Sequence, residues 1–260
     1  MVIRDRSKIK QLSMRQLAIL FLAGALVFLS GAAYGQSGAV GHFHKVMVSP
    51  YIQATFVQGD AESVTINSSI VDTGKFHVEV ARGTLKLYLE GAREISRNDR
   101  HYNDGRGQSH SLYPDHAVIV TVVYKKMDAL SLRGEEKYLC ESPLSLSRFR
   151  LWVYGESTVI FTQVHISKMH TTIYGESTLD IRSGVIDKQV YTCYGEGKIN
   201  STAIAGRAAK VTAFGEAEFR VNVSDRIKLT AFGEAKLRYM GNPAIVRGIH
   251  FGEIDVKKLD

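Results

Sequence analysis

Seven copies of the dipeptide Gly-Glu, spaced 18 to 21 residues apart, constrain the fold more than any other feature of the sequence. Six of the seven glycines follow an aromatic residue. The copies are Gly134-Glu135, Gly155-Glu156, Gly175-Glu176, Gly195-Glu196, Gly215-Glu216, Gly233-Glu234 and Gly252-Glu253. Regular spacing of this kind marks an internal repeat, and repeats of about 20 residues are typical of solenoids.

Within each copy, apolar or small residues alternate with polar or aromatic ones. Around Gly155, the even positions hold Val153 and Val159. The odd positions hold Tyr154 and Glu156. A period of two indicates a β-strand whose even positions face the core.

A repeat of about 20 residues is too short for a strand, a helix and a return, so each copy is expected to form one coil of a parallel, right-handed β-helix. Neighbouring strands would lie about 4.8 Å apart. A glycine inside a strand indicates a bulge, a bend or the close approach of another backbone. The predicted fold is all-β, with a solenoid of about six to seven coils over residues 131–260.

Residues 36–130 form a separate N-terminal β region in this prediction. Short alternating stretches are divided by turn residues such as Gln58-Gly59-Asp60 and Arg82-Gly83. We expect antiparallel strands that cap one end of the solenoid, because an open solenoid end invites strand addition. The last coil, with His250 and Val256 inward, would close the other end.

Residues 91–116 break the strand pattern with polar residues and glycine, and we predict a long mobile loop there. Histidines and aspartates gather in this segment, but their spacing matches no known metal site. They are His101, Asp104, His110, Asp115 and His116. We therefore predict a solvated loop and no metal site.

Residues 1–35 have the organisation of an export signal. A basic start is followed by the apolar stretch Leu17–Leu29, and Ala33-Tyr34-Gly35 offers a cleavage site. The apolar stretch is short for a membrane-spanning helix, so we expect no membrane span after cleavage; an uncleaved N-terminal anchor is the alternative. The mature protein is expected in the periplasm, on the outer membrane surface or outside the cell.

Cleavage would also remove most of the positive charge. The formal net charge of +7 would fall to +3, because residues 1–35 hold five basic residues and one acidic residue. Nucleic-acid-binding domains are commonly strongly basic. We therefore predict no nucleic-acid partner.

Several motifs together resemble a known family. They are Phe43-x-x-Val46, Gln58-Gly59-Asp60, Gly83-Thr84-Leu85, the glycine-centred coils and the closing Tyr239-x-Gly241-x-Pro243. Over residues 40–256 the chain is similar to exported Bacteroidetes proteins of the DUF2807 type, described as "putative auto-transporter adhesin, head GIN domain". The resemblance implies an exported, all-β, solenoid-like protein. The chain departs from the family in placing Glu, and not a small residue, after each of these glycines.

Stacked coils would align the glutamates of the repeat in a carboxylate column. All seven glutamates of the repeat would align, from Glu135 to Glu253; the five central ones, which form the candidate binding site and are called the carboxylate column here, are Glu156, Glu176, Glu196, Glu216 and Glu234. Carboxylates about 4.8 Å apart repel by about 1 kcal/mol in water-like surroundings. Solvent and nearby lysines (Lys137, Lys198, Lys236), a bridging cation such as Ca²⁺, or protonation of some glutamates would offset the repulsion. A recognition role for the column is the remaining alternative.

An aromatic column would lie beside the carboxylates. It consists of Tyr154, Tyr174, Tyr194, Phe214, Phe232 and Phe251, with Trp152 near one end. An exposed apolar stripe of this length usually marks an interface. The rings would serve either as a surface that binds sugar or protein, or as a stabilising stack covered by another part of the chain or by a second copy.

Catalytic signatures are absent from the sequence. Glycoside cleavage uses two carboxylates in distinct environments, whereas the repeat makes its glutamates alike. The two cysteines, Cys140 and Cys193, would lie about three coils apart, which is roughly 14 Å and too far for a disulfide. We predict that both thiols are free.

The sequence therefore predicts an exported, non-enzymatic, adhesin-like binding protein that presents the aromatic and carboxylate columns to a glycan or a cell-surface protein. The alternative is a structural envelope protein that forms homo-oligomers through the two columns. A weaker alternative is a carbohydrate-active enzyme.

Overall fold

A computed structural model describes residues 36–92, 98–101 and 108–260, so the expected export signal lies outside the described residues. The described chain is almost entirely β-strand, with one 3-10 turn, η1 (Thr73–Lys75). The strands are β1 (Gln36–Ala39), β2 (Lys45–Val48), β3 (Ile52–Gln58), β4 (Ser63–Ser69), β5 (Phe76–Ala81), β6 (Thr84–Leu89), β7 (Asn98–His101), β8 (Gln108–Ser111), β9 (Val118–Tyr124), β10 (Ala129–Gly134), β11 (Lys137–Cys140), β12 (Leu144–Gly155), β13 (Thr158–Phe161), β14 (Val164–Gly175), β15 (Thr178–Ile181), β16 (Gly184–Tyr194), β17 (Lys198–Ser201), β18 (Ile204–Ala205), β19 (Ala208–Asn222), β20 (Arg226–Met240), β21 (Ala244–Phe251) and β22 (Ile254–Lys258).

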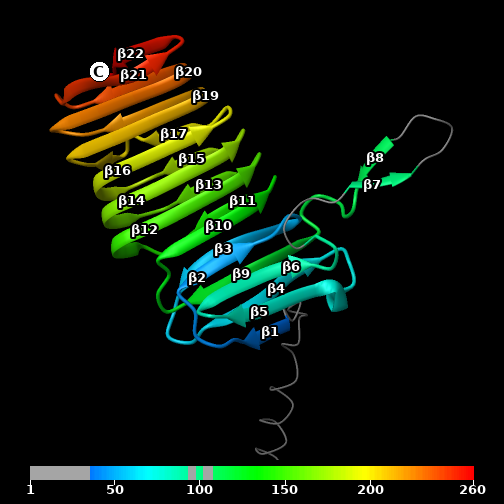
Figure 1. The fold of residues 1–260 in the computed structure, drawn as a ribbon. Helices are drawn as coiled ribbons and strands as arrows, with labels where there is room; N and C mark the ends of the chain where they lie inside the picture. Colours follow the sequence, from blue (N-terminus) through cyan, green and yellow to red (C-terminus); the bar gives the residue numbers. More distant parts are fainter. Residues whose placement is uncertain (1–35, 93–97, 102–107) are drawn as a thin grey trace, which may run out of the picture. The chain divides into compact units, whose positions relative to one another are not determined.

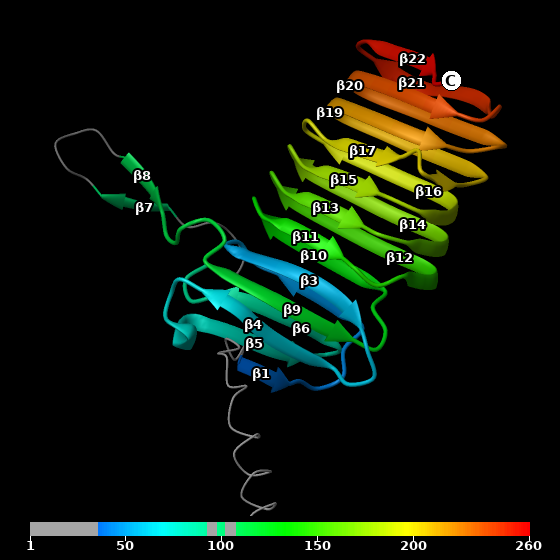
Figure 2. The ribbon, with the colours of Figure 1, turned by 180° about the vertical axis from the view of Figure 1, so that it is seen from behind.

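From β10 onward the strands stack in parallel, coil on coil, as Figures 1 and 2 show. Before the glycine corner, β10, β12, β14, β16, β19, β20 and β21 pair in succession. After the corner, β11, β13, β15, β17, β19, β20 and β22 pair in succession. Gly134 lies opposite Gly155, and Gly155 lies opposite Gly175. The predicted parallel β-solenoid and its register are confirmed; its right-handed sense stays a prediction.

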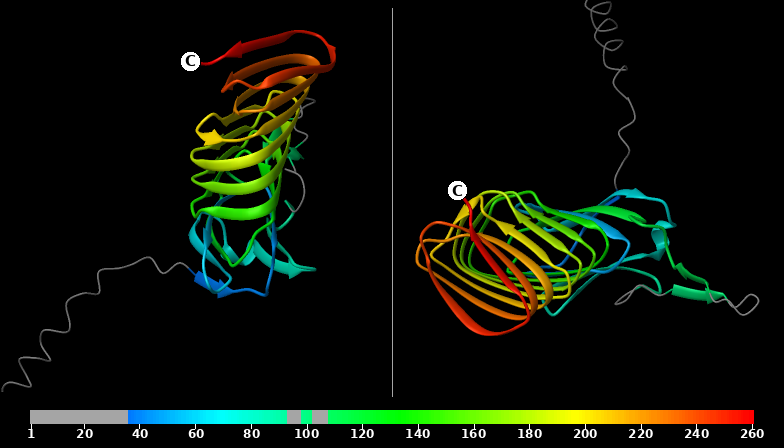
Figure 3. Two further views of the ribbon diagram at one scale, coloured as in Figure 1. Left: turned by 90° about the vertical axis from the view of Figure 1, so that its left-hand side faces the viewer. Right: turned by 90° about the horizontal axis from the view of Figure 1, so that it is seen from above.

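The middle coils have a short additional side. β12 and β14 begin with a three-residue stretch that pairs with the next coil, after which the pairing skips one residue, Ser147 opposite Ser167 and Ser167 opposite Asp187. β16 begins with two residues that pair with β18, and its pairing with β19 resumes at Lys188. The chain turns at this point before the long pre-corner segment begins. Seen from above in Figure 3, the coils appear as stacked loops.

The N-terminal strands belong to the same stack. β2 pairs in parallel with β6 on one side and with β10 on the other, and β3 pairs in parallel with β9 and with β11. Residues 45–58 therefore form a coil that lies between the strands of residues 84–124 and the first repeat coil. The expectation of an antiparallel N-terminal region is wrong for β2 and β3, which pair in parallel on both sides, and correct for β1, β4 and β5, which pair antiparallel with β4, β9 and β6. β6 and β9 therefore each have one parallel and one antiparallel neighbour.

Residues 91–116 contain a short two-stranded antiparallel sheet, β7 with β8. The prediction of a loop throughout this segment is therefore wrong for residues 98–101 and 108–111. His101 and His110 lie in these strands, and Asp104 lies outside the described residues. Asp115 and His116 are exposed beyond the second strand.

The core lies inside the coils and is built from the even positions of the repeat. In the coils from β10 to β20, the residues two and four positions on either side of each glycine are buried. They include large side chains such as Tyr138, Tyr191 and Phe219, each 0% exposed. The predicted division into an inner and an outer face is confirmed for these coils.

The last coil differs from the coils beneath it. His250 lies opposite Ala231, as the repeat requires, but it is exposed, and Val256 is only partly buried. Ile249 and Phe251 are 66% and 68% exposed. The prediction that His250 faces inward and helps to close this end is wrong, because in the described chain β21 and β22 pair on one side only, with β20.

Both cysteines are free and buried, as predicted. Burial raises the pKa of the Cys193 thiol to about 12, and it raises the pKa of Cys140 as well. Thiols in such surroundings stay protonated and unreactive at neutral pH.

Candidate functional site

The corner of every repeat coil requires glycine for two independent reasons. Gly155, Gly175 and Gly215 have φ values of 106°, 109° and 117°, a region that residues with a side chain rarely adopt. A Cβ added to Gly175 would also lie 2.5 Å from the carbonyl oxygen of Gly155. The close backbone approach that the sequence predicted is confirmed, and it places the residues on either side of the corner in straight columns.

The aromatic column is a stack of nearly parallel rings. Ring centroids of successive rings from Tyr154 to Phe232 lie 4.7–5.0 Å apart, with interplanar angles of 3–4°. Each inner ring is covered on both faces by its neighbours, so only ring edges and tyrosine hydroxyls reach the solvent. Mutual burial raises the pKa of the Tyr174 hydroxyl, with Tyr154 and Tyr194 adding to the effect.

The two ends of the aromatic column are not alike. At the first end, the Arg133 guanidinium lies 5.4 Å from the centre of the Tyr154 ring and covers its face. At the other end, Phe251 lies 5.8 Å from Phe232 with an interplanar angle of 28°, and it is 68% exposed. Phe251 therefore presents the open ring face of the column. Trp152 is half-buried and lies opposite Thr172, two positions further from the corner than the rings.

The carboxylate column is fully on the surface. Glu156, Glu176, Glu196, Glu216 and Glu234 are all exposed. Among the described residues, none of the five forms an ion pair with the lysines two positions further on. Lysine pairing, one of the ways in which the repulsion between these carboxylates could be offset, is therefore not found among the described residues.

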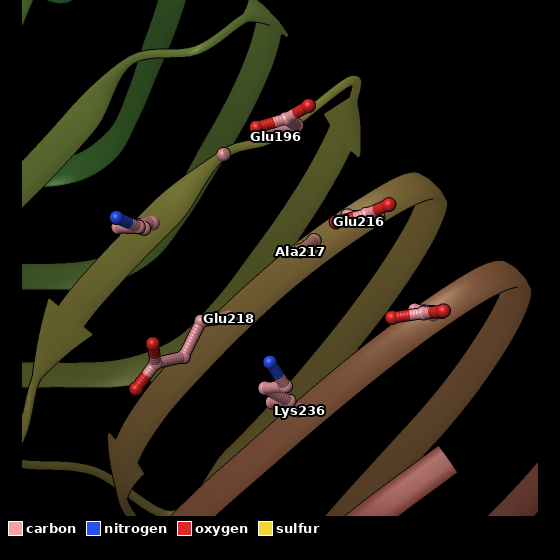
Figure 4. A pocket seen from close by; sticks show the side chains of 8 residues that line it. Glu196, Glu216, Ala217, Glu218 and Lys236 are labelled. Carbon is pink, nitrogen blue, oxygen red and sulfur yellow. The ribbon is translucent and has the colours of Figure 1, made fainter. Parts of the chain in front are cut away.

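A shallow hollow of about 220 Å³ lies along the carboxylate column. Figure 4 shows Glu196 and Glu216 side by side at the corner, with Glu218 and Lys236 on the strand segments that follow. In register, Glu218 lies between Lys198 and Lys236, and it forms an ion pair with Arg220 at 2.7 Å. The hollow thus offers alternating charges and few apolar contacts.

Metal binding by the carboxylate column stays a prediction. In the part of the chain that the structure describes, no three His, Cys, Asp or Glu side chains are grouped so that they could hold a metal ion. A Ca²⁺ ion would therefore have to bridge two glutamates of neighbouring coils and take its other ligands from water.

One carboxylate of the repeat is buried. Glu136 is 3% exposed and occupies the inner position at which the next five coils have Ser, Gly or Ala and the last coil has Ile254. Its Oε1 accepts a hydrogen bond from the Tyr51 backbone N–H at 2.6 Å, and its Oε2 accepts one from the Tyr138 hydroxyl at 3.3 Å. Burial raises the pKa of Glu136, and hydrogen bonds from the backbone N–H groups of Tyr51, Glu136 and Glu135 partly oppose this increase. Tyr51 has a φ of 69°, so Glu136 holds the strained turn between β2 and β3 against the first repeat coil.

A basic patch that was not predicted from the sequence lies on the outer face of the strand segments before the glycine corner, the face that also carries the aromatic column. It consists of Lys126, Arg148, Arg150, Lys168, Lys188 and Lys210, with His170 among them. Arg148, Lys168 and Lys188 lie opposite one another seven positions before their glycines. Extending the repeat alignment beyond four positions from the glycine would have revealed these cations.

The geometry can now be compared with known proteins. Residues 42–243 match the model of a family described as "Putative auto-transporter adhesin, head GIN domain". The chain belongs to this DUF2807 family. The description is that of an adhesin and not of an enzyme, and no curated protein is significantly similar to the chain.

Solved structures share the fold at low sequence identity. A "putative adhesin" from Bacteroides fragilis NCTC 9343 is 15% identical with a TM-score of 0.70, over 86% of this chain and 95% of that one. A "putative lipid binding protein" from Parabacteroides distasonis ATCC 8503 is 17% identical with a TM-score of 0.60, over 87% and 98% of the two chains. A "putative adhesin" from Parabacteroides merdae ATCC 43184 is 15% identical with a TM-score of 0.57, over 85% and 95%. These likenesses establish the fold.

The described residues include no helix long and apolar enough to cross a lipid bilayer.

Proposed function

We propose that this member of the DUF2807 family is an exported, non-enzymatic binding protein whose ligand, a glycan or a cell-surface protein, contacts the aromatic and carboxylate columns. The observation that carries the proposal is the continuous exposure of the aromatic column, in which Tyr174, Tyr194, Phe214 and Phe232 are each 36–39% exposed. Contiguous apolar surface of this kind commonly marks a binding site. The adhesin description of the family supports the same role.

The stacking of the rings separates two modes of binding. A sugar ring that stacks on an aromatic residue needs an open ring face, and the column offers one at Phe251. A protein partner could instead contact the ring edges and tyrosine hydroxyls along the side of the column, where the carboxylates accept hydrogen bonds. Glycan stacking therefore depends on Phe251, whereas lateral protein contact depends on the inner rings.

The test is binding of the purified protein to immobilised polysaccharides and to surface proteins of neighbouring cells, with Ca²⁺ and with a chelator. Phe251→Ala should weaken glycan binding about tenfold or more, since a stacked ring contributes roughly 1–3 kcal/mol. Tyr174→Phe, which keeps the ring and removes the hydroxyl, is the matched control for glycan stacking and the probe for lateral contact. Binding that neither variant nor Glu176→Gln changes would contradict the proposed site, and loss of binding with chelator would support a bridging Ca²⁺ ion.

A structural role is the second candidate, and the uncapped end of the solenoid favours it. Strands β21 and β22 have free hydrogen-bonding edges in the described chain, and Ile249 and Phe251 are exposed there. Free strand edges promote pairing between chains. A stable dimer in light scattering that Ile249→Lys disrupts, together with no binding to glycans or surface proteins, would favour this second role.

A further inference from the structure

The basic patch is an assembly of like charges that the fold itself brings together. Arg148, Lys168 and Lys188 come from three successive coils and lie in one register column. Arg150 and His170 lie in a second column two residues closer to the corner. Side chains two residues apart on a strand share a face, and neighbouring coils lie about 4.8 Å apart. Five charged or titratable side chains from three coils therefore crowd one face of the sheet.

These cations lack carboxylate partners. In residues 36–92, 98–101 and 108–260, the ion pairs of lysine and arginine involve Lys86, Arg182, Arg207, Arg220 and Arg238, none of which belongs to the patch. Two carboxylates lie nearby, Asp128 and Asp187, and Asp187 is held by Arg207 at 2.7 Å. The single negative charge of Asp128 cannot neutralise the positive charge of the patch. The cations therefore repel one another unless an anion binds between them.

The electrostatic effect is visible at His170. The pKa of His170 is lowered by burial first and then by the positive charges of Lys168, Arg148, Arg150 and Lys210. These four cations come from its own coil, from the coil beneath, and from the coil of β19. The lowered pKa of His170 therefore indicates that the positive charges of several coils act on one side chain.

The surface of the patch is hollowed. Two adjoining hollows, of about 360 Å³ and about 400 Å³, share Ser147 and Arg148. Lys126 and Arg150 line the first, and Lys168 and Lys188 line the second. The hydroxyls of Ser147 and Ser167, at the bends of two of the three coils, can donate hydrogen bonds to a carboxylate or sulfate oxygen, whereas the third coil has Asp187 at this position.

We infer that the basic patch binds an acidic polysaccharide, a chain of sugars that carries carboxylate or sulfate groups, with successive anions placed between successive coils. Arginine and lysine recognise such groups by charge and, for arginine, by paired hydrogen bonds. Thr172, Thr192 and Thr212 lie opposite one another in the column next to the patch, where their hydroxyls can meet sugar hydroxyls. The inference concerns a surface separate from the carboxylate column and does not require that column to bind anything.

Other polyanions fit the surface less well. Proteins that bind single-stranded nucleic acid stack the bases on open aromatic faces, whereas the inner rings of the aromatic column are covered on both faces. Duplex DNA is read by elements that enter a groove, and this face is a sheet. The column beside the cations holds threonine hydroxyls and one apolar side chain, the half-buried Trp152, which is too little apolar surface to enter a membrane.

The experiment measures binding of the full-length purified protein to dextran sulfate, polygalacturonate and neutral dextran. Dextran sulfate should bind saturably and neutral dextran should not, and the affinity should fall about tenfold or more when salt rises from about 50 to about 200 mM, because bound counterions are released. Binding of both acidic polymers would show that charge alone selects the ligand, and binding of one would identify sulfate or carboxylate as the preferred group. Binding of neither would overturn the inference.

The double variant Arg148→Gln with Lys168→Gln should weaken dextran sulfate binding about tenfold or more. The matched control, Arg220→Gln with Arg238→Gln, removes the same two charges from the strand segments after the corner and should change affinity less than about twofold. Equal losses in the two double variants would show a nonspecific charge effect and overturn the inference. Thermal unfolding of both variants confirms that they are folded.

Two further measurements decide the location and the class of ligand. Dextran sulfate should raise the pKa of His170 in an NMR titration of its imidazole, and an unchanged His170 would place the anion elsewhere and contradict the proposed site. Tighter binding to single- or double-stranded DNA of matched charge, or to vesicles with anionic lipids, than to both acidic polysaccharides would assign the patch to a different partner and overturn the inference.

Discussion

The two ends of the solenoid differ in whether their strand edges and their last aromatic ring are covered. At the first end, antiparallel strands β4 and β5 cover the outer edges of β9 and β6, and Arg133 covers the first ring of the aromatic column. At the last end, β21 and β22 have free edges and Phe251 is open to solvent. Departures from the repeat mark the closed end, where Arg133 replaces an aromatic residue and Glu136 replaces a small one. The last coil also departs from the repeat, with Gly248, His250 and Ile254 at its inner positions. It stays open because no strand of the described chain pairs with its outer edge, and each coil leaves its hydrogen-bonding edge for the next.

The largest effect on stability is expected when the glycine of a central corner is replaced by alanine, and a smaller effect is expected for the same replacement at the open end. Gly175→Ala should destabilise the protein by about 3 kcal/mol or more, because it combines a strained φ with a backbone clash on a coil that is paired on both sides. Gly252→Ala meets the same clash, at 2.3 Å from the Gly233 oxygen, but it should release the last coil and leave the rest folded. Hydrogen exchange measured along the chain distinguishes global from local loss of protection.

The control for this comparison is Gly38→Ala, where an added Cβ has no neighbour within 4 Å. Its stability should stay within about 0.5 kcal/mol of the wild type. Equal global destabilisation by Gly175→Ala and Gly252→Ala would show that the two ends are energetically alike.

The next effect concerns Glu136 at the closed end. Glu136→Ala leaves the Tyr51 N–H without its acceptor and should cost about 2–4 kcal/mol of unfolding free energy. Glu136→Gln keeps an acceptor oxygen and should cost less. Urea denaturation of the three proteins measures both differences.

The difference in unfolding free energy between wild type and Glu136→Gln should change with pH in a definite direction. Because burial raises the folded-state pKa of Glu136, the stability from this carboxyl is fully present below its unfolded pKa and is lost as pH rises through the folded pKa. The stability advantage of wild type over Glu136→Gln should therefore shrink as pH rises above about 4.3, the pKa of an unperturbed glutamate. An advantage that grows over this range would mean that the pKa of Glu136 is lowered and not raised.

A smaller effect separates inner and terminal rings of the aromatic column. Phe214 is stacked on both faces, at 4.7 Å and 5.0 Å, so Phe214→Ala should cost about 2–3 kcal/mol. Phe251→Ala removes a ring stacked on one face and should cost less than about 1 kcal/mol. Phe214→Tyr, which introduces the residue found in three other rings of the column, is the control and should leave the unfolding free energy in chemical denaturation nearly unchanged. If Phe251→Ala costs as much as Phe214→Ala, the last ring is covered in solution, as a dimer would do.

The smallest effect is expected at His170. Its folded-state pKa is lowered, so the unfolded chain binds a proton more readily and the protein loses stability as pH falls below about 6.5. His170→Gln should reduce this acid sensitivity, seen as a smaller drop in melting temperature between about pH 7 and about pH 5. His165→Gln, an exposed histidine on the short side of the same coil, is the control. An equal change in both variants would contradict the role of the basic patch.

The two columns of the candidate site were predictable from the sequence, whereas the ring orientation and the basic patch were not predicted. The columns at Tyr174 and Glu176 followed from the repeat, because residues at equal positions in stacked parallel coils must lie opposite one another. The edge-on presentation of the rings did not, because ring orientation depends on contacts with the rings above and below. The cations of the basic patch also recur with the repeat, but the low net charge of +3 expected after cleavage of residues 1–35 gave no sign that the coils gather these cations on one face.

The sequence by itself determined the coil length, the inner and outer faces and the glycine corners, since an alternation of period two and a residue without a side chain act within a single coil. Only the tertiary structure decided that residues 45–58 form a coil between residues 84–124 and the first repeat, and that the last coil stays open. The reason is physical: side-chain patterns specify which face of a strand is buried, whereas backbone hydrogen bonds at strand edges are nearly alike along the chain. Which edge meets which is therefore settled when the whole stack assembles.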